Sequence, residues 1–337
     1  IKSYWDGEIQ WFTPSEIGKN KYVDSSLRTI TEEGLNNSSA KLLPPNTILL
    51  SSRATIGECS LSLRECATNQ GFQSLVSKKC YVDFLYYLIQ TKKRDLIRKS
   101  CGSTFLEISA NEVRKIQVSV PTDVEQQKIA GLLSLIDERI ATQNKIIEDL
   151  KKLKSAIRKK MFSLLKDEYT ESFEINQLLD YEQPTAYIVA NDEYSTDTSL
   201  TPVLTANKGF ILGYTDEKFG IYQKGECIIF DDFTMDAKYV SFPFKVKSSA
   251  IKILTAKPNV NLRFMFEYLS YWELKSEEHK RHYISEIASL VIELPSKERQ
   301  SIIASLMTSL NSKLDIEAKT KIRYEEQKRY LLSQMFI

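Results

Sequence analysis

The chain has 337 residues, 42% of them hydrophobic, and its 46 Lys and Arg nearly balance 44 Asp and Glu, leaving a net charge of +2. This apolar content excludes a disordered or fibrous protein and suffices for about two domains. The near-zero net charge excludes bulk attraction to a polyanion, so any nucleic-acid site must come from local clustering. No apolar run approaches the ~20 residues of a membrane-spanning helix, so no membrane contact is expected.

Residues 1–120 read as the first mixed α/β domain. A Pro-Pro-Asn turn leads into a predicted strand at 48–50, a short amphipathic helix is predicted at 82–89, and an apolar strand at 116–120 ends before Pro121. Because the chain begins with Ile1 and no basic, apolar leader follows, we expect its natural start to lie upstream.

Residues 121–167 read as one long helix. Within this range no proline follows Pro121, and Asp123 is the predicted N-cap. About forty residues would form a rod of about 60 Å, which needs a partner to bury its apolar seam. Gln143 and Lys154 interrupt that seam. Its apolar residues follow alternating steps of three and four, as in a coiled coil: Ile129, Leu133, Ile136, Ile140, Ile147, Leu150, Ile157, Met161 and Leu164.

Residues 168–294 read as a second mixed α/β domain. Strands are predicted at 228–230 and 290–294, and a short helix at 262–269.

A second long helix is predicted at 295–337, with Ser296 as its N-cap. Glu317 and Lys321 interrupt its seam. The remaining seam positions are apolar: Ile303, Met307, Leu310, Leu314, Tyr324, Leu331 and Met335.

The two long helices are an internal repeat with an offset of 174 residues. The register holds without a gap for about forty residues, which chance matches would not sustain. It aligns Pro121 with Pro295, Gln126 with Gln300, Ala130 with Ala304, Lys154 with Lys328, and Met161 with Met335. The sequence therefore predicts an α+β protein: two mixed α/β domains separated by two long helices that pack as an antiparallel coiled coil, with a pseudo-twofold internal repeat.

The order of these motifs resembles the specificity subunit of type I restriction–modification systems along essentially the whole chain. Residues 43–57 read LPPNTILLSSRATIG, 68–72 TNQGF, 102–104 GST, 108–109 IS, 120–121 VP and 125–130 EQQKIA. In the second half, 202–205 read PVLT and 213–215 GYT. Two departures stand out: the family usually has further residues before a motif like the YWDGEI of 4–9, and ERQ at 298–300 is a degraded copy of the first helix motif.

The resemblance implies a non-enzymatic DNA-recognition subunit. Each of its two target-recognition domains would read one half of a bipartite double-stranded DNA site, and the helices would set the spacing. Two DNA methyltransferase (modification) subunits would dock on it, and restriction/translocase subunits would join through the complex. One alternative is a non-catalytic coiled-coil adaptor whose globular domains bind proteins; another is an enzyme that acts on DNA by itself.

The residues offer no catalytic constellation and no expected cofactor. An Asn-Pro-Pro-Tyr-type methylation element and a glycine-rich nucleotide loop are both missing. Asp231, Asp232 and Asp236 suit a polar turn better than a metal cluster. The five Cys form no Cys-x-x-Cys pair, and His279 and His282 lack a third ligand, so we expect no metal site, no disulfide framework and a reducing, cytoplasmic setting.

Local groups suited to DNA lie on predicted turns. Arg53 offers a guanidinium fork for guanine or phosphate beside Ser51 and Thr55, although pairing with a carboxylate such as Glu58 is an equal alternative. In the second domain Thr205, Asn207 and Lys208 suit adenine and phosphate, or form a plain hairpin turn. Ser103 and Thr104 could donate to phosphate, or form a turn.

Two basic runs, at 92–99 and 151–160, have less specific interpretations. Both suit a solvated helix face, and the second also suits the negative end of a helix dipole. Phosphate or partner contact is the alternative.

Overall fold

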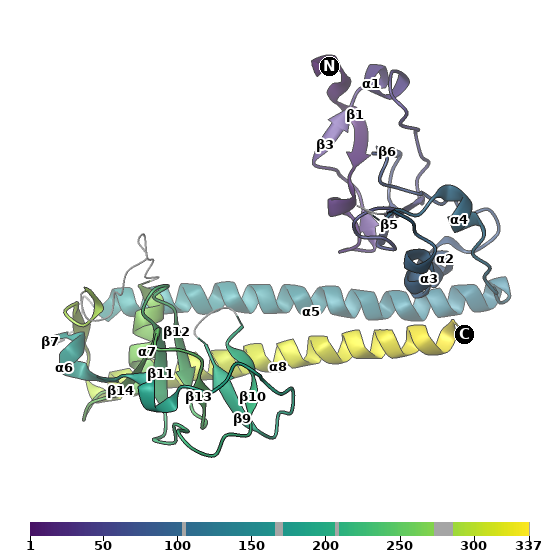
Figure 1. The fold of residues 1–337 in the computed structure, drawn as a ribbon. Helices are drawn as coiled ribbons and strands as arrows, with labels where there is room; N and C mark the ends of the chain where they lie inside the picture. Colours follow the sequence, from purple (N-terminus) through teal and green to yellow (C-terminus); the bar gives the residue numbers. More distant parts are fainter. Residues whose placement is uncertain (103–105, 166–170, 206–208, 273–285, 337) are drawn as a thin grey trace. The chain divides into compact units, whose positions relative to one another are not determined.

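The computed structural model describes residues 1–102, 106–165, 171–205, 209–272 and 286–336 (Figure 1). Its contacts divide the chain into two compact units. Unit 1 is Ile1–Lys145 with Ala318–Ile337, and unit 2 is Ile146–Glu317. Each unit therefore contains one globular part together with portions of both long helices. None of the helices among the described residues is long and apolar enough to cross a membrane.

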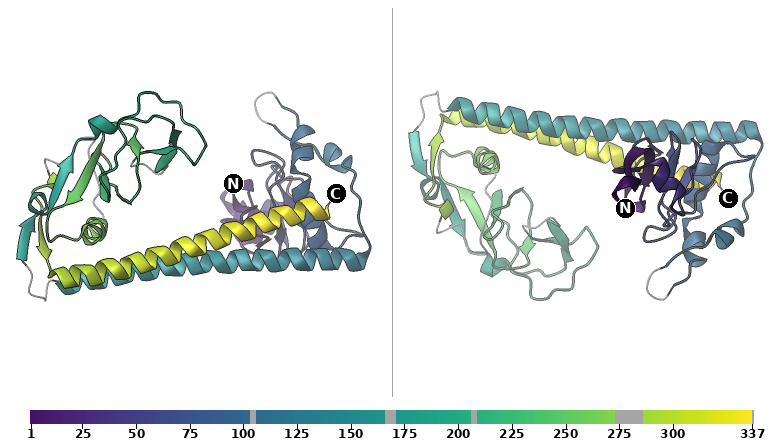
Figure 2. Two further views of the ribbon diagram at one scale, coloured as in Figure 1. Left: turned by 90° about the horizontal axis from the view of Figure 1, so that it is seen from below. Right: turned by 90° about the horizontal axis from the view of Figure 1, so that it is seen from above.

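The two long helices, α5 (Asp123–Leu164) and α8 (Lys297–Met335), are antiparallel where they meet within each unit. In unit 1, Asp137 of α5 contacts Lys328 of α8 at 2.7 Å. In unit 2, the end of α5, at Phe162, shares a buried cluster with the start of α8, at Ile303. Within each unit, Figure 2 shows the portions of the two helices side by side in both views. The predicted antiparallel pairing is confirmed.

One predicted helix cap is correct and one is wrong. Ser296 precedes α8, and its Oγ accepts a hydrogen bond from the N–H of Arg299 at 3.3 Å. Asp123, in contrast, is already the first helical residue of α5. Thr122 precedes it and donates from its Oγ1 to Glu125 Oε2 at 3.1 Å. Threonine and aspartate are both favoured N-cap residues, so N-cap propensity alone could not decide between Thr122 and Asp123.

The two polar residues that interrupt the apolar stripe of α5, Gln143 and Lys154, are buried or partly buried. Gln143 is only 6% exposed. Burial also lowers the pKa of Lys154 below its usual value. Both polar side chains therefore lie at packed positions of the helix.

The repeated glutamines explain why the two helix starts are alike. Gln126 Nε2 donates to the Pro121 carbonyl at 2.9 Å, and its Oε1 accepts from the N–H of Tyr81 at 2.9 Å. Tyr81 is the N-cap of the short helix α2 (Val82–Thr91). Each buried amide thus ties the start of a long helix to the start of a short one.

Gln300 repeats this arrangement in unit 2. Its Nε2 donates to the Pro295 carbonyl at 2.9 Å, and its Oε1 accepts at 2.9 Å from the N–H of Asn261, the N-cap of α7 (Leu262–Tyr271). The aromatic packing is repeated too. Phe84 of α2 lies 5.1 Å from Phe336, and Phe264 of α7 lies 5.6 Å from Phe162, between ring centroids. The duplication therefore extends from sequence to individual contacts, and the predicted short helices are confirmed.

The globular part of unit 1 holds two three-stranded sheets in the orders β3-β1-β6 and β2-β5-β4. Strand β1 pairs antiparallel with β3 and parallel with β6, while β4 pairs antiparallel with β5. The strands are β1 (Trp5–Phe12), β2 (Tyr22–Val23), β3 (Arg28–Ile30), β4 (Ile48–Leu50), β5 (Cys59–Ser62) and β6 (Cys66–Thr68). Its shorter helices are η1 (Lys2–Tyr4), η2 (Pro14–Glu16), α1 (Glu32–Asn36), α3 (Lys93–Arg98) and α4 (Ala110–Arg114).

The globular part of unit 2 repeats the pairing of the first sheet, in the order β10-β9-β13, whereas its second sheet has four strands in the order β12-β11-β14-β8. Strand β9 pairs antiparallel with β10 and parallel with β13, and β11 pairs antiparallel with β12 and β14. The strands are β8 (Leu179–Glu182), β9 (Thr201–Leu204), β10 (Ile211–Thr215), β11 (Cys227–Asp231), β12 (Ala237–Val240), β13 (Lys245–Val246) and β14 (Ile251–Ala256). Two short helices, α6 (Ile175–Leu178) and η4 (Pro184–Tyr187), connect them.

Of the two predicted strands before the long helices, only the second forms. Strand β15 (Val291–Leu294) pairs antiparallel with β7 (Glu171–Glu174). Residues 116–120 are not a strand. A strand needs a neighbour to satisfy its backbone groups, and no described segment pairs with 116–120. The predicted strands at 48–50 and 228–230 are confirmed as β4 and the centre of β11.

Candidate nucleic-acid interface

The turn at 51–58 joins β4 to β5 and carries Arg53. Ser51 is fully buried, and its Oγ donates to the Arg53 carbonyl at 2.8 Å. Thr55, which is exposed, donates from Oγ1 to Ser51 Oγ at 3.1 Å. Ser51 therefore holds the turn and has no exposed surface for DNA, which corrects the expectation that it makes a direct contact.

Arg53 forms an ion pair, but not with the expected partner. Its Nε lies 2.9 Å from Glu107 Oε1, and the two side chains are 43% and 39% exposed. Glu58 pairs instead with Lys93. Exposed pairs of this kind contribute little stability, about 0–1 kcal/mol, so Arg53 can exchange its partner for another acceptor at low cost.

The hairpin expected near Thr205 is present. Its strands β9 and β10 are antiparallel, and the Thr205 N–H donates to the Phe210 carbonyl at 2.9 Å. Thr205 itself is half-buried. Four of the predicted contact residues lie outside the described part of the chain: Ser103, Thr104, Asn207 and Lys208.

Strand directions bring three connections of unit 2 to one end of its sheets. Because β9 and β13 are parallel, the Thr205 hairpin and residue 247 leave their strands on the same side. The Lys247 N–H donates to the Leu204 carbonyl at 3.0 Å. The turn at 231–236 lies at the same end, because the Asp232 N–H donates to the Ala250 carbonyl, at the end of the 247–250 loop, at 2.9 Å. We call this the loop end of unit 2.

Unit 1 has an equivalent loop end. The Asn69 N–H donates to the Phe12 carbonyl at 3.1 Å, at the shared end of β1 and β6. The Ser52 N–H donates to the Gly71 carbonyl at 2.9 Å, which places residues 69–71 beside the Arg53 turn. Ser52 and Asp232 stand 180 positions apart, as do Ile48 and Ile228 in the strands before them. The turns at 51–58 and 231–236 are therefore equivalent elements.

The aspartates at 231–236 form a polar turn, as predicted. Asp231 Oδ1 accepts from the N–H groups of Phe233 and Thr234, both at 2.8 Å. Asp232 forms a buried pair with Lys252 at 3.5 Å. Among the described residues no group of three His, Cys, Asp or Glu could hold a metal ion. His279 and His282 lie outside those residues.

The two basic runs are partly committed to internal contacts. In the first, Lys93 pairs with Glu58 and Arg98 with Asp95. In the second, Arg158 lies 2.8 Å from the buried Glu267 carboxylate. The charge of Arg158 therefore holds unit 2 together and is not offered to DNA.

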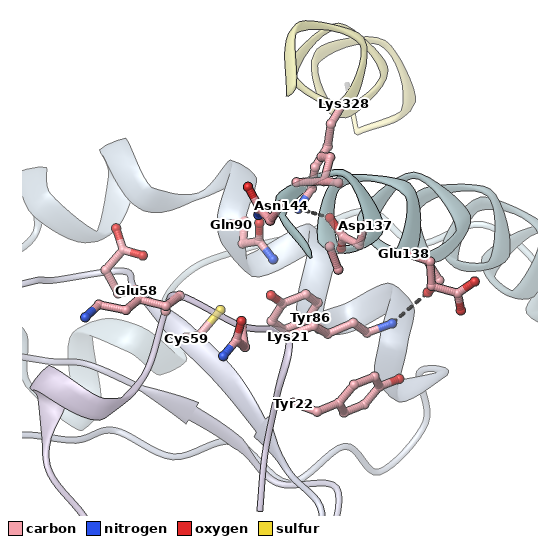
Figure 3. A pocket seen from close by; sticks show the side chains of 16 residues that line it. Lys21, Tyr22, Glu58, Cys59, Tyr86, Gln90, Asp137, Glu138, Asn144 and Lys328 are labelled. Atoms are coloured by element: carbon pink, nitrogen blue, oxygen red, sulfur yellow. Dashed lines mark hydrogen bonds and ion pairs between the residues drawn. The ribbon is translucent and has the colours of Figure 1, made fainter. Parts of the chain in front are cut away.

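A cavity of about 420 Å³ lies in unit 1 between the globular part and the long helices (Figure 3). Lys21 reaches across it, donates to Ser134 Oγ at 2.7 Å and pairs with Asp83 at 3.2 Å. Burial raises the pKa of the Cys59 thiol in its wall to about 12, so this thiol is no nucleophile at neutral pH. Polar side chains line this cavity, and the Lys21–Ser134 hydrogen bond links the globular part to α5.

The chain matches the family model for the type I restriction modification DNA specificity domain over residues 2–152 and 168–326. These matches cover both globular parts and most of both long helices. The chain belongs to this family.

Curated relatives within the specificity-subunit family are similar to parts of the chain. The MjaIX specificity subunit of Methanocaldococcus jannaschii is 37% identical over 194 residues, which are 56% of this chain and 45% of that protein. The EcoR124I/EcoR124II specificity subunit of Escherichia coli is 39% identical over 178 residues, 47% of this chain and 43% of that protein. The matched region thus spans less than half the length of either relative.

Two solved structures share the fold. The type I specificity subunit from M. genitalium superposes with a TM-score of 0.66 at 17% identity, covering 99% of this chain and 94% of that one. A chain from a structural study of complex assembly and conformational transition in a type I restriction–modification system gives 0.58 at 13% identity, covering 99% and 95%. At these identities the likeness supports the α+β fold alone, with its two globular parts and two long helices.

Sequence reasoning missed two features of this specificity-family chain. Glu107, the partner of Arg53, lies 54 positions away, and no local pattern connects them. The loop at 247–250 was also overlooked, because no sequence pattern distinguishes the exposed Lys247 from the buried Lys245.

Proposed function

We propose that this specificity subunit reads a bipartite double-stranded DNA target, one half with each globular part. The observation that supports this proposal is a pair of related globular parts, which share one sheet pairing and duplicated helix contacts but carry different loops. Two sites that share a framework and differ in their exposed groups suit a target of two different half-sequences. The target-recognition domains comprise residues 1–120 and 168–294, and the helical spacers comprise 121–167 and 295–337.

The subunit itself performs no chemistry in this proposal. It directs two DNA methyltransferase subunits, and through them restriction/translocase subunits, to the target in the cytoplasm. A net charge of +2 supports this dependence on partners, because counterion release by clustered Lys and Arg usually supplies much of DNA affinity. We expect the isolated chain to bind DNA weakly and the assembled complex to bind tightly.

Among the described residues, the proposed contacts Arg53, Thr55 and Thr205 lie on the loop ends. In unit 1, Arg53 contacts guanine or phosphate from the turn at 51–58, and the exposed Thr55 lies in the same turn. In unit 2 the Thr205 hairpin contributes, with Asn207 and Lys208 as further proposed contacts. Ser103 and Thr104 remain proposed phosphate donors in unit 1.

Selection from a random-sequence duplex pool, followed by sequencing of the bound fraction, tests the function. The chain should be used alone and together with methyltransferase subunits of its system. Enrichment of two short motifs at a fixed separation is expected. Tight, sequence-independent binding, or no DNA binding by any assembly, would favour the coiled-coil adaptor.

A further inference from the structure

The loop at 247–250 in unit 2 and the loop at 69–71 in unit 1 occupy the same place in the fold. In unit 2 the loop follows β13, which is parallel to β9, and leads into β14, which pairs with β11. In unit 1 the loop follows β6, which is parallel to β1, and leads into the segment that pairs with β4. Backbone hydrogen bonds hold both ends of each loop at equivalent places. In unit 2 they join Lys247 to Leu204 and Ala250 to Asp232. In unit 1 they join Asn69 to Phe12 and Gly71 to Ser52. Both loops therefore lie at the loop end, between the other two connections.

Lys247 differs from the lysines on either side of it. Lys245 is fully buried and pairs with Glu217 at 2.5 Å, and Lys252 is 1% exposed and pairs with Asp232. Lys247 is exposed. No carboxylate in the described part of the chain lies within 4.0 Å of its ammonium group. Its neighbours' charges are satisfied within unit 2, whereas its own is available to an external anion.

Two exposed hydroxyl groups follow it, those of Ser248 and Ser249. Ser248 Oγ accepts weakly from the Ala250 N–H at 3.4 Å, which leaves its hydroxyl proton for an outside acceptor. The flanking backbone is fixed by strand β13 and by the Asp232–Ala250 bond. A cation and two hydroxyl donors on a fixed backbone are the groups that proteins use for DNA phosphate.

The acidic groups of the neighbouring turn are mostly occupied. Asp231 accepts two backbone N–H groups, and Asp232 pairs with Lys252. Asp236 is the exposed acid of that turn. The loop thus presents its positive charge with little internal competition.

From this geometry we infer that Lys247, Ser248 and Ser249 form a phosphate-binding loop that grips the DNA backbone next to the half-site read by unit 2. The inference rests on the proposed DNA-recognition function. It assigns this loop an anchoring role, whereas the selection of bases belongs to neighbouring turns.

The equivalent loop of unit 1 has different chemistry. It offers no cation: Asn69 Oδ1 accepts from the Gly71 N–H at 2.9 Å, and Gln70 presents an exposed amide. An amide can donate to DNA without neutralising a phosphate. The two loops should therefore contribute differently to the salt dependence of binding.

The test uses the full chain in the assembly that binds the selected duplex, with affinity measured across a salt series. Lys247→Ala should weaken binding about tenfold for target and unrelated duplexes alike, and lower the slope of log affinity against log salt by about one. Gln70→Ala should leave that slope unchanged. Lys224→Ala is the matched control, since Lys224 is exposed in unit 2 but pairs with Glu182.

A second measurement locates the contact. Single neutral methylphosphonates are placed in turn along the unit 2 half-site, and one position should weaken wild-type binding but not that of Lys247→Ala. If no duplex is selected at all, the proposed function fails. If selection succeeds but Lys247→Ala behaves like Lys224→Ala, or every methylphosphonate affects both proteins equally, the phosphate-binding loop is refuted while DNA recognition stands.

Discussion

The carboxylate of Glu267 is fully buried in unit 2 and pairs directly with the Arg158 guanidinium. Arg158 Nη2 and Nε lie 2.8 Å and 3.1 Å from Glu267 Oε2, while Asn311 Nδ2 donates to Oε1 at 3.3 Å. The Arg158 side chain is 19% exposed. Removing a partner from such a pair leaves an uncompensated charge away from water.

Arg158→Ala should therefore lower the free energy of unfolding by about 3 kcal/mol. Chemical denaturation measures this change. The second substitution Glu267→Gln should recover part of the loss, because a neutral amide needs no counter-ion. Lys224→Ala, which removes an exposed pair with Glu182, should leave stability nearly unchanged, because solvent screens that pair. Equal effects of the two alanine substitutions would contradict the importance of burial here.

The cysteines divide by burial, and their reactivity should follow. Burial raises the pKa of Cys59 and Cys227 to about 12 and that of Cys66 to about 11. A raised pKa leaves almost no thiolate at pH 8. Cys101 is exposed.

A thiol reagent at pH 8 should label Cys101 in the native chain and spare Cys59, Cys66 and Cys227. Denaturant should make all of them reactive, because both their burial and their pKa shifts are lost. Mass spectrometry of digested, labelled protein gives the sites. Rapid native labelling of Cys59 would mean that the wall of the unit 1 cavity opens readily.

At the scale of elements, the two buried glutamines join each long helix to a short one. Each side-chain amide makes two bonds, to a proline carbonyl and to the backbone N–H of an N-cap residue. Truncation would leave a backbone N–H and a carbonyl in a partly buried position without these partners, which costs about 1–3 kcal/mol.

Gln126→Ala and Gln300→Ala should therefore destabilise the chain by similar amounts, each about 1–3 kcal/mol. Thermal or chemical unfolding measures both. Gln127→Ala, one position along on the exposed face, is the matched control and should be within about 0.5 kcal/mol of wild type. A large effect of Gln126 with none of Gln300 would show that the equivalent contacts are not equivalent in energy.

The helices were predictable because their signals are long and periodic. The offset of 174 residues also indicated that Gln126 and Gln300 share a role, although it did not identify their partners. Local propensity was insufficient where a neighbour decides the structure. Residues 116–120 have an apolar strand pattern but no described partner, while β15 has β7.

The candidate contacts were predictable as residue types but not as surfaces. Ser51 has suitable chemistry, yet it is buried because the turn uses its hydroxyl internally. Arg53 was recognised, but its partner Glu107 arrives from a distant segment. Lys247 became visible only when strand directions placed its loop beside two others.

At the scale of the whole molecule, the duplicated framework predicts independent contributions from the two units. Arg53 belongs to unit 1 and Lys247 to unit 2, and they share no partner among the described residues. Free-energy changes at such sites usually add within about 0.5 kcal/mol. Their chemistry also differs, because a guanidinium fork can discriminate bases whereas a lysine on phosphate cannot.

Arg53→Ala should cost roughly 1–3 kcal/mol of binding free energy and relax the preference in only one half of the target, if it reads a base. Lys247→Ala should preserve both preferences and weaken binding uniformly. Titration of the wild type, both single variants and the double variant against the selected duplex and its half-site substitutions measures these effects. The double variant should lose the sum of the single losses. A coupling above about 1 kcal/mol, or relaxed preference in both halves from Arg53→Ala alone, would show that the two units read DNA as one surface, and the helices would then transmit conformational change as well as set spacing.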